Sequence, residues 1–124
     1  MLQGDFFDLS FTPVTSRSVL ATFNINPSHP IFEGHFPGQP VVPGVCMMQM
    51  LKELLEKVIE KETRLRKADY LKFLAIIDPT ENPTIQAELS YSNDEAGAII
   101  VIARLYNEKI TFLKFKGQFT LLES

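Results

Sequence analysis

Residues 34–45 read GHFPGQPVVPGV, a stretch that holds three prolines and three glycines. The wider segment 26–43 contains five of the chain's eight prolines. Because proline fixes φ and lacks an amide donor, this segment is predicted to be neither a helix nor a central strand, but a long, stiff loop. Its apolar residues favour a loop packed against the protein over a disordered one, and they are Ile31, Phe32, Phe36, Val41 and Val42.

The sequence on either side of this loop has two different periodicities. Before it, residues 17–25 alternate apolar and polar side chains, which predicts a strand. After it, residues 45–62 predict a helix whose core face carries Met48, Leu51, Leu55, Val58 and Ile59. Four more strands are expected at 68–77, 84–91, 98–106 and 110–121. This order predicts a single α+β domain over residues 1–124, with an antiparallel sheet wrapped around one long helix.

Composition excludes several classes of protein. The 124 residues are 45% hydrophobic with a net charge of −3, as expected for a globular domain and not for a chain with a basic nucleic-acid surface. No apolar run approaches the roughly 20 residues of a membrane span, and the N-terminus lacks a basic signal-peptide region. Cys46 is the single cysteine, which fits a reducing compartment, and two histidines without ligand spacing predict no metal site. We expect a cytoplasmic protein.

The stretch at 34–45 resembles the signature G-H-F-P-G-x-P-V-x-P-G-V of the β-hydroxyacyl-acyl-carrier-protein dehydratases, which are hotdog-fold enzymes, and every fixed position matches. The resemblance is weaker elsewhere, since the lead-in before the first strand and the R-x-P-V-x-P-G-D pattern after the helix are missing. It implies dehydration of (3R)-hydroxyacyl thioesters without a cofactor, in a homodimer with shared sites, on chains carried by acyl carrier protein or CoA.

The resemblance also implies roles for residues of this stretch. His35 would be the base that removes the α-proton, because a neutral imidazole suits this task near pH 7. The Gly44 amide at the helix start would bind the thioester carbonyl, and an acyl tunnel would run along the helix. Substrate contacts are expected from Phe36, Gly38, Val41, Pro43, Gly44, Val45 and Cys46. His29, by contrast, is expected to be a hydrogen-bonded structural residue.

The second half of the site departs from the family. Its helix carboxylate, fourteen positions after the histidine, is replaced by Gln49, and Glu53 stands four residues later where the family has Gln. The two residues share one helix face, placed well over 100° from the expected core face. Glu53 is therefore either a displaced acid, with Gln49 as a hydrogen-bond donor to substrate, or an exposed charge paired with Lys57 beside a weakened site.

Several alternatives stay open at this point. An acyl thioesterase would use Glu53 to activate water, and a non-catalytic acyl-binding subunit would need neither residue. Cys46, in the first helical turn, is either a nucleophile or a packing residue. Asp69 and Tyr70 are further candidates without a geometric argument. An acidic carrier would dock on basic residues, for which the candidates are Arg64, Arg66, Lys67, Lys114 and Lys116.

Overall fold

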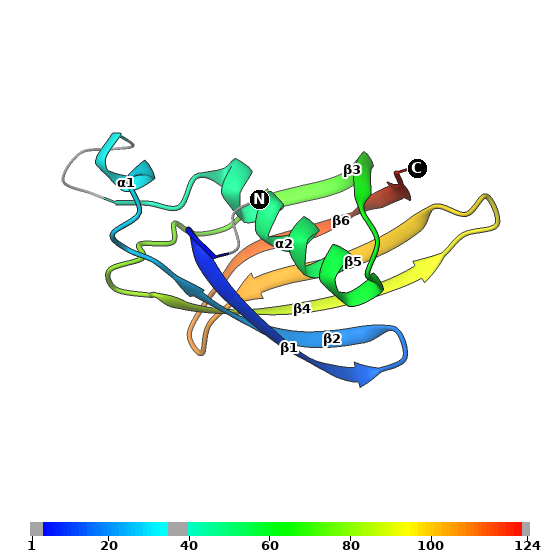
Figure 1. Cartoon of the computed structure of the whole chain (residues 1–124), viewed down its shortest axis with the longest axis horizontal. Helices are drawn as coiled ribbons and strands as arrows, with labels where there is room; N and C mark the ends of the chain where they lie inside the picture. The colour runs from blue at the N-terminus through cyan, green and yellow to red at the C-terminus, as the bar shows by residue number, and fades with distance from the viewer. Residues whose placement is uncertain (1–3, 35–39, 123–124) are drawn as a thin grey trace.

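The computed structural model describes residues 4–34 and 40–122. Within them lie six strands and two helices (Figure 1). The strands are β1 (Phe7–Thr15), β2 (Ser18–Ile25), β3 (Thr63–Phe73), β4 (Thr84–Asn93), β5 (Ile99–Tyr106) and β6 (Thr111–Leu121). The helices are α1 (Ile31–Gly34) and α2 (Gly44–Ile59).

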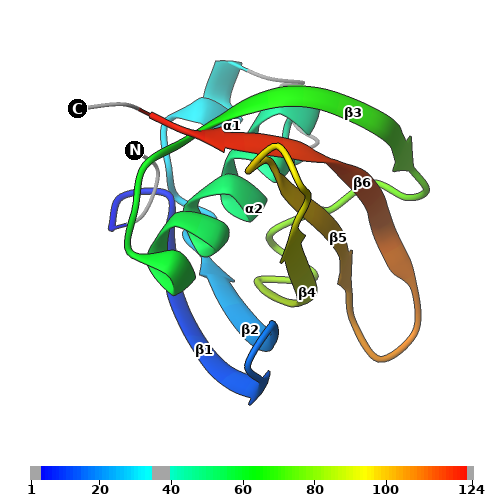
Figure 2. The same cartoon turned by 90° about the vertical axis from the view of Figure 1, so that its right-hand side faces the viewer.

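The strands form one antiparallel sheet in the order β1-β2-β4-β5-β6-β3. The sheet is strongly curved, and its concave side holds α2 (Figure 2). The predicted α+β architecture, a sheet wrapped around one long helix, is confirmed. Strands β1 and β3 form the two edges of the sheet, and β3 lies on the side of the helix that carries Gly44, Val45 and Gln49.

Strand β1 was not predicted, because Pro13 interrupts its alternating pattern. The structure accommodates this proline on an edge strand, where no further neighbour needs its amide, and the register with β2 shifts between Pro13 and Thr15. The prediction that 26–43 contains no helix is also wrong, since α1 forms one turn directly after Pro30. Proline is tolerated at a helix start, and the Ile31 amide donates to His29 Nδ1 at 3.0 Å. His29 thus has the structural role expected of it.

Helix α2 ends three residues before the predicted boundary. Glu60 adopts a left-handed conformation with φ of 57°, which stops the helix after Ile59. Strand β3 then begins at Thr63, whose amide and hydroxyl both donate to the Glu56 carboxylate. The prediction missed the first residues of this strand because bulges near Lys67 and Tyr70 interrupt the alternation of its side chains. The strand ends at Phe73, before the predicted residue 77.

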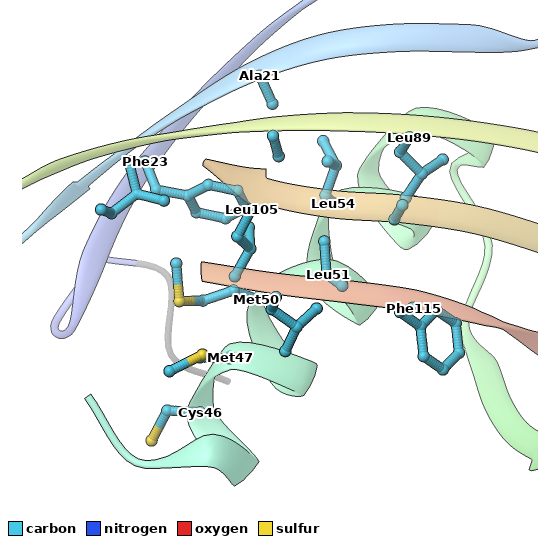
Figure 3. Close-up of a cluster of buried hydrophobic side chains, with 14 of the residues drawn as sticks. Ala21, Phe23, Cys46, Met47, Met50, Leu51, Leu54, Leu89, Leu105 and Phe115 are labelled. Atoms are coloured by element: carbon cyan, nitrogen blue, oxygen red, sulfur yellow. The ribbon is translucent and has the colours of Figure 1, made fainter. Parts of the chain in front are cut away.

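The core lies between α2 and the concave face of the sheet (Figure 3). Leu51 and Leu55 are buried as predicted, but Met48, Val58 and Ile59 are only partly buried. The fully buried face of the helix is rotated toward Cys46, Met47, Met50, Glu53 and Leu54. The predicted core face was therefore misplaced, and Glu53 lies inside the protein.

The junction of β3 with β6 depends on a glycine. Gly117 pairs with Ala68 between the two bulges of this ladder. A Cβ atom at Gly117 would lie 2.5 Å from the Lys67 carbonyl oxygen and 2.5 Å from Phe115 Cζ. Only a residue without a side chain therefore allows β3 to approach β6 this closely.

Candidate functional site: a slot at the start of helix α2

Three of the predicted site residues, His35, Phe36 and Gly38, lie outside the described residues, so their roles stay predictions. The described half of the site begins where the chain enters α2. There the Val42 amide donates to the Ile77 carbonyl at 2.9 Å, which attaches the incoming segment to the loop after β3. Val41 and Pro43 are half-buried beside it.

The N-terminus of α2 has no side-chain cap. Pro43 occupies the N-cap position, and its carbonyl accepts from the amides of Cys46 and Met47 at 2.9 and 3.2 Å. No acidic residue lies in the first turn. Since the first amides of a helix have no acceptor within it and the dipole adds partial positive charge, this end favours an oxygen with developing negative charge.

A largely apolar slot of about 550 Å³ runs from this helix start between α2 and β3. The helix contributes one wall of the slot and the inner face of the sheet the other, and the lining residues are Gly44, Val45, Met48, Gln49, Lys52, Leu65, Leu71, Phe73 and Phe119. Gln49 is therefore an amide among mostly apolar neighbours. The slot brings together Gly44, Val45 and Gln49 from the predicted set.

Gln49 and Glu53 form a hydrogen-bonded pair. Gln49 Nε2 donates to Glu53 Oε2 at 3.0 Å, across one turn of the helix. Gln49 is half-buried and lines the slot, whereas Glu53 is 2% exposed and is absent from the slot's lining. The expectation that Glu53 is an exposed charge is therefore wrong. A buried carboxylate needs hydrogen-bond donors, and Gln49 supplies one while keeping its side chain at the slot wall.

The sheet side of the slot was not predicted. Phe73, the last residue of β3, places its ring against Gly44: a Cβ atom there would lie 2.9 Å from Phe73 Cζ. In this structure the Phe73 ring fills the space that the missing side chain of Gly44 leaves. The alternation of Leu71 and Phe73 in the sequence was the available signal for this wall.

Other predicted candidates lie away from the slot or are chemically unsuited. Tyr70 lines a groove on the outer face of the sheet, next to Lys114, and Asp69 pairs with Lys67 at 3.4 Å. Cys46 is 5% exposed, and burial raises the pKa of its thiol. A raised pKa disfavours the thiolate, so Cys46 has the properties of a packing residue.

The basic candidates for carrier docking are on β3 and β6. Arg64, Arg66, Lys67 and Lys114 are exposed, and Lys116 is partly exposed. Across 4–34 and 40–122, no group of three or more His, Cys, Asp and Glu side chains is arranged to hold a metal ion. Over the same residues, no helix is long and apolar enough to cross a membrane.

Comparison of the sequence with known proteins finds similarity to dehydratases in each case described here. A family model described as ApeI-like, ApeI dehydratase, matches residues 12–116. The 3-hydroxyacyl-[acyl-carrier-protein] dehydratase FabZ of Chlamydia pneumoniae is 30% identical over 107 residues, covering 79% of this chain and 70% of the relative. FabZ of Oenococcus oeni is 27% identical over 103 residues, covering 77% of this chain and 74% of the relative.

Solved structures show the same fold. The dehydratase heterocomplex ApeI:P from Xenorhabdus doucetiae contains a chain with a TM-score of 0.71 and 15% identity, covering 95% of this chain and 99% of that one. A hypothetical thioesterase protein with coenzyme A from Streptococcus pneumoniae has a TM-score of 0.70 and 6% identity, covering 97% of this chain and 90% of that one. At these identities the two structures establish the fold alone.

Proposed function

Because the chain belongs to the ApeI-like dehydratase family, we propose that it converts (3R)-hydroxyacyl thioesters, bound to acyl carrier protein or CoA, into trans-2-enoyl thioesters. The observation that carries this proposal is the slot at the uncapped start of α2, with Gln49 on its wall. A thioester carbonyl at the helix start and an acyl chain along the slot would bring the reacting carbons between Gly44 and Gln49.

In the proposed reaction, His35 removes a proton from C2 while the Gly44 amide stabilises the charge that develops on the thioester oxygen. The C3–oxygen bond then breaks, and the hydroxyl leaves as water. Because an amide cannot donate a proton at neutral pH, the proton taken up by His35 is the one returned to the leaving hydroxyl. The elimination thus needs no outside reactant.

Gln49 is proposed to hold the leaving hydroxyl. It lies five residues after Gly44, about 7.5 Å along the helix axis, and helical side chains tilt back toward the N-terminus. Its amide is therefore within reach of a C3 hydroxyl whose thioester is bound at Gly44. Glu53, which accepts from Gln49 Nε2 at 3.0 Å, fixes the orientation of this amide from inside the protein.

The products of a direct assay test this function. Purified protein is incubated with 3-hydroxyacyl thioesters of several chain lengths, and enoyl product and free thiol are measured. The proposal expects enoyl product. Free thiol without enoyl product would favour a thioesterase, and neither product would favour a non-catalytic subunit.

Two substitutions separate the roles of the hydrogen-bonded pair. Glu53→Gln keeps an oxygen that can accept from Gln49, so we expect activity within about fivefold of the wild type if Glu53 only orients Gln49. A loss of about a hundredfold or more, typical of a missing acid–base group, would instead make Glu53 the proton donor. Gln49→Glu places a carboxyl on the slot wall and is expected to raise the dehydration rate.

A second copy of the chain is the proposed partner at the β3 edge. Beside this edge, large apolar side chains are exposed: Val45 is 78%, Ile76 69% and Leu74 51% accessible. Exposed apolar residues gathered beside an unpaired strand mark an interface. We expect a homodimer in light scattering, and a monomer at micromolar concentration would contradict it.

The replacement of the family's acid by Gln49 favours one second candidate function. The ApeI:P structure is described as a dehydratase heterocomplex. In an analogous arrangement, this chain would pair with a different, active subunit and contribute its slot. Co-expression with a candidate partner, followed by the assay above, would show enoyl formation that the isolated chain lacks.

A further inference from the structure

The contact between Phe73 and Gly44 is the starting point for an inference about substrate selection. An added Cβ at Gly44 would meet three atoms of the ring, with Cζ at 2.9 Å, Cε1 at 3.1 Å and Cε2 at 3.6 Å. The ring therefore lies with its far end over the first residue of α2. A side chain at position 44 would therefore require the Phe73 ring to shift.

The same ring is a wall of the slot and not part of the closed core. Phe73 is 53% exposed, whereas the neighbouring inner-face residues Leu113 and Phe115 of β6 are 0% exposed. Phe73 pairs with Leu113 at the end of the β3–β6 ladder, so the strand holds its backbone in place. The position of the ring is thus set by the sheet, and in the single chain the ring lines the slot.

The place of the ring determines which carbon of a substrate it meets. If the thioester carbonyl binds the Gly44 amide, C2 is one bond from the carbonyl carbon and lies next to the ring. C4 and later carbons lie further along the slot, toward Leu71 and Leu65. A substituent at C2 and the distal carbons of a longer chain would therefore contact different side chains.

We propose that Phe73 is a specificity-determining residue that excludes acyl groups branched at C2 and admits unbranched ones. This inference rests on the proposed function for the position of the thioester. A methyl group at C2 would need the space that the ring occupies over Gly44, and one methyl group in an apolar pocket changes selectivity by roughly 10–200-fold.

The test compares 3-hydroxyhexanoyl-pantetheine with its 2-methyl analogue, supplied as both C2 epimers. We expect the wild type to prefer the unbranched substrate in kcat/KM, and Phe73→Ala to reduce this preference at least about tenfold. Phe73→Leu retains an apolar side chain, so its preference for the unbranched substrate is expected to lie between those of the wild type and Phe73→Ala. Leu71→Ala is the matched control on the same wall; it is expected to change the rates for both substrates alike and to leave their ratio intact.

A ratio within twofold of the wild type in Phe73→Ala, or an equal change in Leu71→Ala, would overturn the inference. Binding of inert ketone analogues of hexanoyl- and 2-methylhexanoyl-pantetheine, in which CH₂ replaces sulfur, supplies a second readout that needs no turnover. If the wild type forms no enoyl product but Phe73→Ala still shifts the ratio of the two Kd values, the proposed function fails and the role of Phe73 stands. An unchanged Kd ratio, or no binding of either ketone by the wild type, overturns the inference.

Discussion

At the scale of single residues, burial separates side chains that the sequence places together. Cys46, Gln49 and Glu53 fall on neighbouring positions of one helix, yet only Gln49 lines the slot. Glu53 and Cys46 are 2% and 5% exposed. A polar residue at a slot wall is open to a ligand, whereas a buried one is not, so the two are proposed to have different roles.

Cys46 gives a prediction at this scale. Because burial raises the pKa of the thiol, little thiolate forms at pH 7 and the group is shielded from reagents. We expect modification by a thiol reagent to be at least about a hundredfold slower in the native protein than in denaturant. The colour released by an aromatic disulfide reagent measures this rate. Rapid native reaction, together with loss of activity, would make Cys46 a reactive residue.

The sequence could predict the residues of the helix side of the site but not those of the sheet side. Gln49 and Glu53 are four residues apart, so their hydrogen bond follows from helical geometry. Phe73 and Gly44 are 29 residues apart in the sequence. Their contact depends on how β3 returns along the helix. Long-range contacts of this kind are set by tertiary packing, which periodicity does not describe.

At the scale of secondary-structure elements, local departures from regular geometry position β3. The strand was predicted too late in the chain because its two bulges conceal the alternation of side chains. Pro13 concealed β1 in a similar way. For regular strands such as β2 and β5, the predicted start lies within one residue of the observed start, since nothing interrupts their alternating patterns.

Gly117→Ala tests the close approach of β3 to β6. The added methyl group would lie 2.5 Å from the Lys67 carbonyl oxygen, so backbone must move to admit it. We expect a loss of about 1–3 kcal/mol in the free energy of unfolding, measured by urea denaturation. Gly97→Ala is the control for the backbone effect of adding a methyl group. No atom lies within 4 Å of a Cβ at Gly97, so only the positive φ of 87° opposes that substitution. Equal stability of Gly117→Ala and the wild type would contradict the packing described here.

Glu60→Gly tests the end of α2. A left-handed conformation costs an L-residue about 1–2 kcal/mol, and glycine adopts it without this cost. Allowing for the extra backbone entropy of glycine, we expect the variant to be about 0.5–1 kcal/mol more stable in thermal or urea unfolding. A less stable variant would mean that the Glu60 side chain makes a contribution that outweighs the strain.

At the scale of the whole molecule, the sheet provides a closed core on one side of α2 and an open slot on the other. The core side is filled by the buried residues of α2 and the inner faces of β2, β4, β5 and β6. The β3 side is left with exposed apolar residues, a half-exposed Phe73 and a largely apolar slot. The proposed acyl binding and the proposed contact with a second subunit both rest on this β3 side.

The central claim is the proposal that this molecule dehydrates 3-hydroxyacyl thioesters with His35 as the base. Its most direct test is the initial rate of enoyl formation from one 3-hydroxyacyl-pantetheine, measured for the wild type and for His35→Ala at equal concentration. We predict enoyl formation by the wild type and a loss of at least about a hundredfold in His35→Ala, as expected when an acid–base group is removed. A wild type that forms no enoyl product, or a His35→Ala variant that forms it at an unchanged rate, would contradict the claim.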